Sequence, residues 1–457
     1  MKKLLVVILV LVVLGLVFPI ANLVVKPRVN PLLSSRQTDE TGYAAVAAIL
    51  EKKCLVCHAP DQELPFYANF PIARDLITRD VKAGTAFINL VDELNPGGNA
   101  PVSESALAMI EYSASSGSMP PARYVVLHWD SGLSANEKKV ILDWVKGVRA
   151  KHYQTPGVAP EFANEAVQPI PLTHAQNMEK VALGDKMFHD VRLSHDNTLS
   201  CASCHGLDKG GTDQKQFSTG INNQMGDINS PTVFNSGFQF KQFWDGRAAD
   251  LQEQADGPVN NPIEMGSNWG EAIPKLQADP EVVAAFAKLY PDGLTSTNVM
   301  NAIAVFEHSL ITPNSRFDKY LMGDANAITP EEKKGYEEFK EHGCATCHAG
   351  KLLGGCSFEK IGLKGDYLGD RGNVIKRDNG RFNVTQKDSD RFRFKVPTLR
   401  NLDKTAPYFH DGTQATLLDA VRMMGKYQSP MPLSDQDAEL IVKFLLTLTG
   451  EYNGKPL

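Results

Sequence analysis

The chain has 457 residues, a length that predicts about three domains. Its formal net charge of −6 at pH 7 gives no electrostatic support to a nucleic-acid partner. Hydrophobic residues make up 42% of the chain and charged residues 22%, as in ordinary globular proteins, so the composition also argues against a disordered chain.

The N-terminus carries a long apolar segment. Two lysines precede a run from Leu4 to Val25 in which only Asn22 is polar. This run is long enough to cross a bilayer as a helix, it exceeds the apolar part of a cleaved signal peptide, and no clean small-residue cleavage site follows it. We therefore expect an uncleaved transmembrane anchor at residues 1–26, with a cleaved signal peptide as the alternative.

Three copies of a Cys-x-x-Cys-His motif use six of the seven cysteines. They are Cys54, Cys57 and His58; Cys201, Cys204 and His205; and Cys344, Cys347 and His348. Two thiols at this spacing can form thioethers with one haem, and the adjacent histidine can then ligate its iron. A zinc site or a thioredoxin-like pair would explain the cysteines but not the histidine beside each pair. The sequence therefore predicts three covalently bound haems of the c type.

The haem motifs also predict the location and the domains of the chain. Haem of the c type is attached outside the cytoplasm, so the expected anchor implies a single-pass inner-membrane protein whose haem domains face the periplasm. Proline-bearing stretches separate the motifs. The expected parts after the anchor are a tether at 27–37, an N-terminal monohaem cytochrome c-like domain at 38–155, a second haem domain at 160–328 and a third at 329–457.

Helix signals dominate the sequence. Ser134 with Glu137, and Ser434 with Asp437, form capping signatures before apolar helical faces. Thr329 precedes a helix with proline at its first position and two glutamates in its first turn. Strand signals are sparse and short, so we predict an all-α fold of three cytochrome c-like domains in tandem behind a transmembrane helix.

Between about residues 165 and 450, the chain carries a dense series of family motifs. They are Gly210-Gly211, Phe217-Ser-Thr-Gly220, Asn229-Ser-Pro-Thr232, Phe243-Trp-Asp-Gly-Arg247, Gln254, Pro262-Ile-Glu-Met-Gly266, Val396-Pro-Thr-Leu-Arg400, Ala406-Pro-Tyr-Phe-His-Asp-Gly412 and Ala420-Val-Arg-Met-Met-Gly425. In order and spacing, this series resembles the bacterial di-haem cytochrome c peroxidases. The resemblance implies a haem peroxidase with the fold of that family.

The resemblance implies different roles for the second and third haems. The haem on Cys201 and Cys204 would be the peroxidatic one, with His205 as its proximal ligand. The third haem would transfer electrons, with His348 and Met424 as iron ligands, and Met423 is the neighbouring alternative for the methionine. A thioether opposite histidine raises the reduction potential, which suits a haem that collects electrons.

The resemblance also implies the catalytic residues. Glu264 aligns with the carboxylate above the open iron, where it can move a proton between the two oxygens of peroxide. Gln254 would orient peroxide or water beside Glu264. Trp244 aligns with an aromatic residue between the two haems, either as part of the electron path or as core packing.

A calcium ion at the domain junction is a further implication. Asn229, Thr405 and Pro407 match the family's calcium site, where side-chain and backbone oxygens supply the hard ligands that calcium takes. His410 lies near the same junction in the family, and a structural role is expected for it.

One position departs from the family pattern. Many relatives place a histidine after Ser-Thr-Gly, where it blocks the peroxidatic iron, and this chain has Ile221. Isoleucine cannot ligate iron, so we expect an open peroxidatic haem in the oxidised protein. Met225, His195 and His189 are spare donors near this position, although none of them aligns with the missing histidine.

The N-terminal motif belongs to a different pattern. Pro65-Phe-Tyr67, Pro71-Ile-Ala73, Ser118-Met-Pro-Pro121, Tyr124 and His128 accompany Cys54, Cys57 and His58, and together they resemble a small haem-binding domain. A methionine followed by proline is a usual distal-ligand arrangement, so Met119 is the expected sixth ligand and His128 the alternative. The whole chain resembles the membrane-bound tri-haem quinol peroxidases.

The expected function is reduction of hydrogen peroxide to water. Electrons would come from quinol or a small c-type cytochrome and pass through the first and third haems to the peroxidatic one; a homodimer is a possible assembly. The alternative is a multihaem electron carrier without catalysis, and an open iron beside Glu264 argues against it. A relative that oxidises a protein side chain would carry tyrosine in place of Met424.

Overall fold

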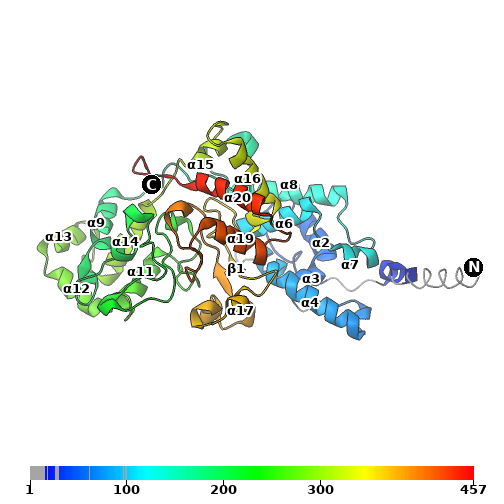
Figure 1. The fold of residues 1–457 in the computed structure, drawn as a ribbon, viewed down its shortest axis with the longest axis horizontal. Coiled ribbons are helices and arrows are strands. Elements are labelled where there is room, and N and C mark those ends of the chain that lie inside the picture. Colours follow the sequence, from blue (N-terminus) through cyan, green and yellow to red (C-terminus); the bar gives the residue numbers. More distant parts are fainter. Residues whose placement is uncertain (1–15, 18, 26–29, 61, 96, 98–99) are drawn as a thin grey trace, which may run out of the picture. The chain divides into compact units, whose positions relative to one another are not determined.

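The computed structural model describes residues 16–17, 19–25, 30–60, 62–95, 97 and 100–457. The chain divides into two compact units, residues 1–153 and residues 154–457 (Figure 1). Each unit is described separately below, and the finer division of the second unit at 328/329 stays a prediction.

The described residues correct the expected N-terminal anchor. They contain no helix long and apolar enough to cross a membrane. The transmembrane helix expected at residues 1–26 is therefore wrong, and so is the single-pass inner-membrane location. In the described part of the run, Asn22 is buried, and its side-chain amide donates a 2.8 Å hydrogen bond to the carbonyl oxygen of Leu127. Residues 1–15, 18 and 26 of the expected anchor and residues 27–29 of the tether lie outside the described residues.

The first unit is built from short helices around the first haem motif. Its helices are α2 (Tyr43–Lys53), α3 (Leu55–His58), α4 (Pro71–Phe87), α5 (Leu90–Leu94), α6 (Glu104–Ser116), α7 (Ala122–Leu127) and α8 (Ala135–His152), with the 3-10 turn η1 (Phe66–Asn69). The capping box of Ser134 and Glu137 is present at the start of α8, with both reciprocal hydrogen bonds formed. Ile141, Trp144 and Val145 are buried on the inner face of α8, which packs against α6. The predicted helix and its apolar face are confirmed.

The second unit is also mainly helical. Its helices are α9 (Met178–Phe188), α10 (Cys201–Cys204), α11 (Leu251–Asn260), α12 (Trp269–Gln277), α13 (Pro280–Leu289), α14 (Ser296–Ser309), α15 (Arg316–Leu321), α16 (Pro330–Glu341), α17 (Tyr367–Arg371), α18 (Phe382–Thr385), α19 (Leu417–Tyr427) and α20 (Asp435–Leu445). The 3-10 turns are η2 (Pro160–Phe162), η3 (Val191–Leu193), η4 (Leu207–Lys209), η5 (Ile221–Asn223), η6 (Ser236–Phe238), η7 (Cys344–Thr346), η8 (Lys376–Asn379), η9 (Asp388–Asp390), η10 (Leu402–Lys404) and η11 (Leu446–Leu448).

Four short strands complete the described structure, and the expected all-α class leaves them out. Strand β1 (Phe358–Lys360) pairs antiparallel with β2 (Arg393–Lys395), with Phe358 opposite Lys395. Strand β3 (Glu451–Tyr452) pairs antiparallel with β4 (Lys455–Pro456) near the C-terminus. The fold is thus mainly helical, with two small two-stranded sheets.

The second and third haem motifs are held by the same kind of helix pair. Helix α9 precedes Cys201 and packs on α14, while α16 precedes Cys344 and packs on α20 (Figure 1). Both pairs meet at a glycine: a Cβ at Gly184 would lie 2.0 Å from the carbonyl oxygen of Ala302, and one at Gly335 would lie 2.0 Å from that of Leu440. Only glycine permits this close approach, so the pairs pack tightly beside the haem motifs.

Two hydrophobic clusters surround these helix pairs. One is formed around α9 and α14 and includes Phe188, Phe286 and Phe306. The other is formed around α16 and α20 and includes Phe317 and Phe444. Each cluster therefore lies beside one haem motif and fixes the helix that leads into it.

Candidate haem and peroxidase site

The three motif histidines are oriented in the same way. In each, ring nitrogen Nδ1 lies within hydrogen-bond distance of a main-chain carbonyl oxygen: 3.2 Å for His58 and Ile88, 3.2 Å for His205 and Gly211, and 2.9 Å for His348 and Leu353. Because a carbonyl can only accept, Nδ1 carries the hydrogen and Nε2 keeps its lone pair. A hydrogen bond from the other ring nitrogen orients metal-ligating histidines in this way, so each motif histidine fits the role of a haem-iron ligand.

The environment of the motif side chains agrees with that role. Burial lowers the pKa of all three histidines, to about 4 for His348, which keeps the imidazole in the neutral form that can ligate a metal. Burial also raises the pKa of the thiols, to about 12 for Cys54 and for Cys344. All six motif cysteines are free of disulfides. Each motif therefore offers two protonated thiols and one neutral imidazole, the set that c-type attachment uses.

A buried acid lies beside the second motif. Glu307 on α14 is only 5% exposed, and its Oε2 has no hydrogen-bond partner. Burial raises the pKa of Glu307 to about 8. Burial is also the main cause of the raised pKa of the Cys201 thiol, and the charge of Glu307 adds to it. An orphaned carboxyl oxygen beside a haem-attachment cysteine is consistent with a polar cofactor edge at this position. Sequence reasoning did not single out Glu307.

Glu264 lies beside the same motif, on the loop that follows α11. The segment 218–221 links the two: Ser218 hydrogen-bonds the Cys204 side chain, and the Ile221 N–H donates to the Glu264 carbonyl oxygen at 2.8 Å. Burial raises the pKa of Cys204, and the charge of Glu264 adds to that rise. Burial raises the pKa of Glu264 itself, against opposing effects of a hydrogen bond from Asn261 and the charge of Arg247. The Asn261 side-chain amide donates to Oε1 at 2.6 Å. The structure thus places a half-buried, oriented carboxyl group next to the second haem motif.

Ile221 is fixed against the loop of Glu264. Its main-chain N–H donates a 2.8 Å hydrogen bond to the carbonyl oxygen of Glu264, and its side chain is only 3% exposed. The spare donors near Ile221 face solvent instead. Met225 is 58% exposed, and the exposed His195 ring pairs with Glu271. His189 pairs with Asp185, and the open peroxidatic haem stays a prediction.

Gln254 and Trp244 lie on segments next to this loop. Gln254 is half-buried on α11, and no hydrogen bond found among the described residues joins its side chain to Glu264. The Trp244 indole N–H donates to the Asn229 carbonyl oxygen at 2.9 Å. Its ring meets the His410 ring edge-on, with centroids 6.3 Å apart. Trp244 is therefore firmly positioned, while the role of Gln254 stays a prediction.

A buried charge network surrounds His410, and sequence reasoning missed most of it. His410 Nε2 lies 2.8 Å from Asp378 Oδ1, and Arg371 bridges Asp378 and Asp411 at 2.7 and 2.6 Å. Although burial itself acts to raise it, hydrogen bonds from His410 and Arg371 hold the pKa of Asp378 well below its usual range. The network fixes His410 against Trp244, in agreement with a structural role for this histidine. Arg371 and Asp378 lie more than 30 residues before His410 and Asp411 in the sequence, so no local pattern could have revealed the network.

The two adjacent methionines on α19 differ in their surroundings. Met423 packs into a small cluster with Tyr367, Leu368 and Tyr427. Met424 is half-buried outside that cluster. Because Met423 is already packed, this arrangement favours Met424 as the available thioether.

The two candidate sixth ligands of the N-terminal haem, Met119 and His128, also differ in their surroundings. Both ring nitrogens of His128 are engaged, Nε2 with the Tyr67 hydroxyl at 2.5 Å and Nδ1 with the Tyr124 carbonyl oxygen at 2.9 Å. The His128 ring also stacks on that of Tyr124, with centroids 3.8 Å apart. Met119 is 39% exposed and makes no such contacts among those described. His128 is therefore less available as an iron ligand than Met119.

The expected calcium ligands are brought together only in part. The Asn229 main-chain N–H donates to the His410 carbonyl oxygen at 2.8 Å, so the segments around 229 and 405–411 lie side by side. The Asn229 side-chain amide donates to the carbonyl oxygens of Lys215 and Gln216. Thr405 and Pro407 have no described contact with Asn229. The calcium site stays a prediction.

Comparison with known proteins agrees with this arrangement. The family model "Di-haem cytochrome c peroxidase" matches residues 178–326, and the model "Haem-binding domain" matches residues 16–147. Cytochrome c peroxidase Ccp of Escherichia coli is 48% identical over 405 residues, covering 88% of this chain and 86% of that protein. Cytochrome c551 peroxidase of Nitrosomonas europaea is 45% identical over 290 residues, covering 63% of this chain and 85% of that protein.

Two solved structures align with a large part of the chain. A MauG-like protein associated with microbial copper homeostasis aligns with a TM-score of 0.56 and 27% identity, covering 62% of this chain and 93% of that one. The di-haem peroxidase BthA of Burkholderia thailandensis aligns with a TM-score of 0.53 and 20% identity, covering 62% of this chain and 90% of that one, which supports the fold alone.

The chain belongs to the bacterial di-haem cytochrome c peroxidase family, with an added N-terminal haem-binding domain. It is a haem-dependent peroxidase, an oxidoreductase of the cytochrome c peroxidase class.

Proposed function

We propose that this peroxidase carries three c-type haems and reduces hydrogen peroxide with two electrons and two protons to give two molecules of water. The observation that carries the proposal is Glu264, a half-buried carboxyl with a raised pKa beside the attachment motif of Cys204. An electron carrier has no use for an oriented acid–base group at one of its haems. A peroxidase requires one, because the O–O bond breaks readily only when a proton moves between its oxygens.

The chain's own residues supply binding, orientation and proton movement. The haem held by Cys201, Cys204 and His205 would supply the iron at which peroxide binds and is reduced. His205 donates from Nδ1 to the Gly211 carbonyl oxygen, which leaves Nε2 as the atom that would hold that iron. Glu264 in its ionised form accepts the proton from bound peroxide and returns it to the departing oxygen. Asn261 keeps the carboxyl in place, and Gln254 orients peroxide or water.

Electrons would reach this site through the other two haems. His348 and Met424 are the proposed ligands of the electron-transferring haem, and His58 and Met119 those of the N-terminal haem. Trp244, held by its hydrogen bond to Asn229, would support transfer between the second and third haems. The proposed donor is quinol or a small c-type cytochrome. A calcium ion at Asn229, Thr405 and Pro407, and a periplasmic setting for haem attachment, belong to the same proposal.

A direct test measures peroxide consumption with each class of donor. Purified haem-loaded protein receives hydrogen peroxide with a reduced quinol analogue, or with a reduced small c-type cytochrome. A Cys54→Ser/Cys57→Ser variant, which cannot attach the N-terminal haem, is compared with wild type. We expect wild type to turn over at least one donor and the variant to lose most of that turnover. Absence of turnover with every donor would contradict the peroxidase assignment, whereas equal rates would contradict entry through the N-terminal haem only.

A further inference from the structure

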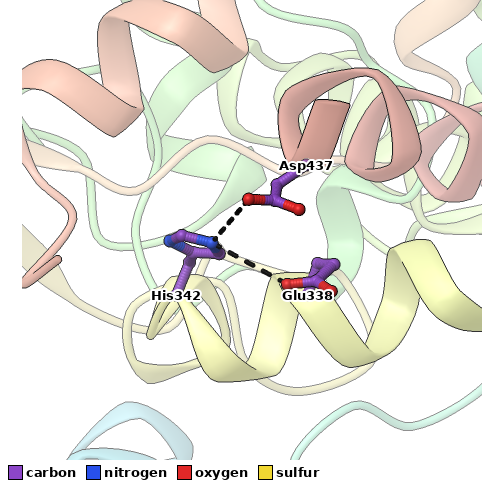
Figure 2. A group of neighbouring side chains, drawn as sticks. All are labelled: Glu338, His342 and Asp437. Atoms are coloured by element: carbon purple, nitrogen blue, oxygen red, sulfur yellow. Dashed lines mark ion pairs between the residues drawn. The ribbon is translucent and has the colours of Figure 1, made fainter. Parts of the chain in front are cut away.

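A histidine and two carboxylates meet beside the third haem motif. Glu338 and His342 lie four residues apart at the end of α16, so they share one face of the helix. Asp437 lies in the first turn of α20, opposite them (Figure 2). His342 comes directly before the Gly343-Cys344 turn that begins the haem motif. None of these three residues takes part in the haem or peroxide chemistry described above.

The histidine is buried and points between the two acids. The His342 side chain is 4% exposed, and its Nε2 lies 3.8 Å from Glu338 Oε2 and 3.8 Å from Asp437 Oδ2 (Figure 2). Both distances exceed the 2.7–3.2 Å of an ordinary N–H···O hydrogen bond, so Nε2 makes no hydrogen bond to either carboxylate. On the other side of the ring, Nδ1 lies 3.5 Å from the Ser429 hydroxyl. A buried ring nitrogen is thus aimed into a gap bordered by two anionic oxygens.

The gap has the dimensions of a metal site. Two ligand atoms that each lie about 2.1 Å from a tetrahedral zinc ion are about 3.4 Å apart. The observed separations of 3.8 Å are a few tenths of an ångström wider than this value and much wider than a hydrogen bond. All three ligand atoms lie within 4.8 Å of one another, so side-chain movements of about one ångström would bring them to bonding distance of one ion.

The charges around the gap also favour a cation. Two carboxylates contribute negative charge, and Lys334, which pairs with the other oxygen of Glu338 at 2.8 Å, offsets only one of them. The Asp437 side chain is 29% exposed and so provides a path from solvent. An imidazole with two carboxylates suits zinc-like divalent ions, whereas calcium takes an all-oxygen shell of six to eight ligands.

A second His–carboxylate group in the described part of the chain lacks these features. His410 Nε2 already makes a 2.8 Å contact with Asp378, and the Arg371 guanidinium lies between Asp378 and Asp411. That arginine neutralises the carboxylates and fills the space that an ion would need. A nearby histidine and two acids are therefore insufficient for a metal site. The distinguishing feature at His342 is that its Nε2 hydrogen-bonds neither carboxylate, while Asp437 Oδ2 accepts a hydrogen bond from the Ser434 hydroxyl at 2.6 Å.

From this geometry we infer that Glu338, His342 and Asp437 form a binding site for one zinc-like divalent cation, with water as the remaining ligand. The ion joins the end of α16 to the start of α20. The same two helices already meet closely at Gly335 and Leu440, one to two turns away. Binding of the ion therefore holds α16 and α20 together next to Cys344 and stabilises the segment that carries the third haem motif.

Zinc titration of the haem-loaded, chelator-treated protein tests this inference by isothermal calorimetry. We expect one saturable site per chain. His342→Gln removes one direct ligand, and Asp437→Asn removes the more exposed one. Each should weaken zinc binding by at least about 10- to 100-fold, the cost of removing even a contact that only supports a ligand. Excess calcium should not displace the zinc. Zinc should also raise the thermal midpoint of wild type and not that of His342→Gln, because only a site in the folded state couples binding to stability.

The matched control is His195→Gln, which removes an exposed histidine paired with Glu271. This variant should bind zinc as wild type does. X-ray absorption at the zinc edge should show nitrogen and oxygen neighbours at about 2.0–2.2 Å. The inference is overturned if wild type shows no saturable site, if His342→Gln and Asp437→Asn both bind zinc with wild-type affinity, or if His195→Gln loses binding to the same extent. These readouts do not depend on peroxidase activity.

Discussion

The side-chain amide of Asn261 donates a 2.6 Å hydrogen bond to Oε1 of Glu264. Burial raises the pKa of this carboxyl group, and the hydrogen bond from Asn261 acts in the opposite direction because it favours the ionised form. The two effects together keep Glu264 able both to accept and to release a proton. The relationship leads to two separate predictions, one for the carboxyl group and one for its partner.

Replacing the carboxyl group should remove proton transfer. Glu264→Gln keeps the size of the side chain and its hydrogen-bonding capacity but cannot take up a proton. We expect kcat for peroxide reduction to fall by about 10²- to 10⁴-fold, the usual contribution of a general acid–base group. Haem content and the absorption spectrum of the His348 haem should not change. The control is Glu281→Gln at an exposed position on α13, and a loss of less than about tenfold in Glu264→Gln would contradict the assigned role.

Replacing its partner should move the pH profile. Asn261→Ala removes a hydrogen bond that lowers the pKa of Glu264, so that pKa rises further. Glu264 must be ionised to accept the proton from peroxide, and ionisation then requires a higher pH. We expect the acid limb of kcat/KM against pH to shift to higher pH, with the greatest loss of activity on the acid side. An unchanged limb would mean that another group controls this ionisation.

The oxidised protein should contain one open haem. Ile221 replaces the expected blocking histidine, and the neighbouring donors Met225 and His195 face solvent. Electron paramagnetic resonance of the fully oxidised protein should therefore show a high-spin signal from the His205 haem, and peroxide should react without prior reduction. If the spectrum contains only low-spin signals, another side chain ligates this iron and the prediction is wrong.

The N-terminal haem offers a comparison between two candidate ligands. Both nitrogens of His128 are engaged with Tyr67 and Tyr124, while Met119 is free of such contacts among the described residues. Met119→Ala should convert the His58 haem from low spin to high spin and lower its reduction potential, because a thioether ligand raises it. His128→Gln should leave the spin state unchanged. The opposite pattern, followed by magnetic circular dichroism, would identify His128 as the ligand.

Local features of the fold could be predicted because they depend on neighbouring residues. Thr329 with Glu332 caps α16, and Ser434 accepts the main-chain N–H of Asp437 at the start of α20, as their spacing indicated. The prediction of a transmembrane helix was wrong because it took no account of contacts between residues far apart in the sequence. Hydropathy along a run ignores tertiary contacts, and Asn22 within that run is buried and bonded to Leu127, more than 100 residues away.

The candidate site residues also divide into those that a local sequence pattern reveals and those that only tertiary contacts reveal. The haem motifs are contiguous, so their histidines and cysteines could be assigned from spacing alone. Arg400 lies in a recognised motif, yet its role appears only in the fold, where its buried guanidinium pairs with Asp318 at 2.7 Å. Glu307 has no sequence signature at all, since only the packing of α14 buries it beside Cys201. Long-range contacts of this kind require the three-dimensional structure.

The buried network around His410 should dominate the acid sensitivity of its region. Asp378 is fully buried, and its contacts with His410 and Arg371 depress its pKa. A depressed folded-state pKa contributes stability that is fully present above the unfolded value of about 3.9 and is lost as the pH falls toward the folded value. At pH 7 that contribution is complete.

Asp378→Asn should therefore lower the free energy of unfolding at pH 7 by about 3–5 kcal/mol, because it leaves the Arg371 charge without one of its buried partners. The difference from wild type should shrink below about pH 4, where the carboxyl of the unfolded wild-type chain is protonated. Urea unfolding of the haem-loaded protein at several pH values measures both effects. Asp388→Asn, which removes an exposed carboxylate paired with Arg391, is the matched control and should have little effect, as for most surface ion pairs. If the loss of unfolding free energy in Asp378→Asn stays constant from pH 7 to pH 3, the carboxyl group contributes by packing and not by its charge.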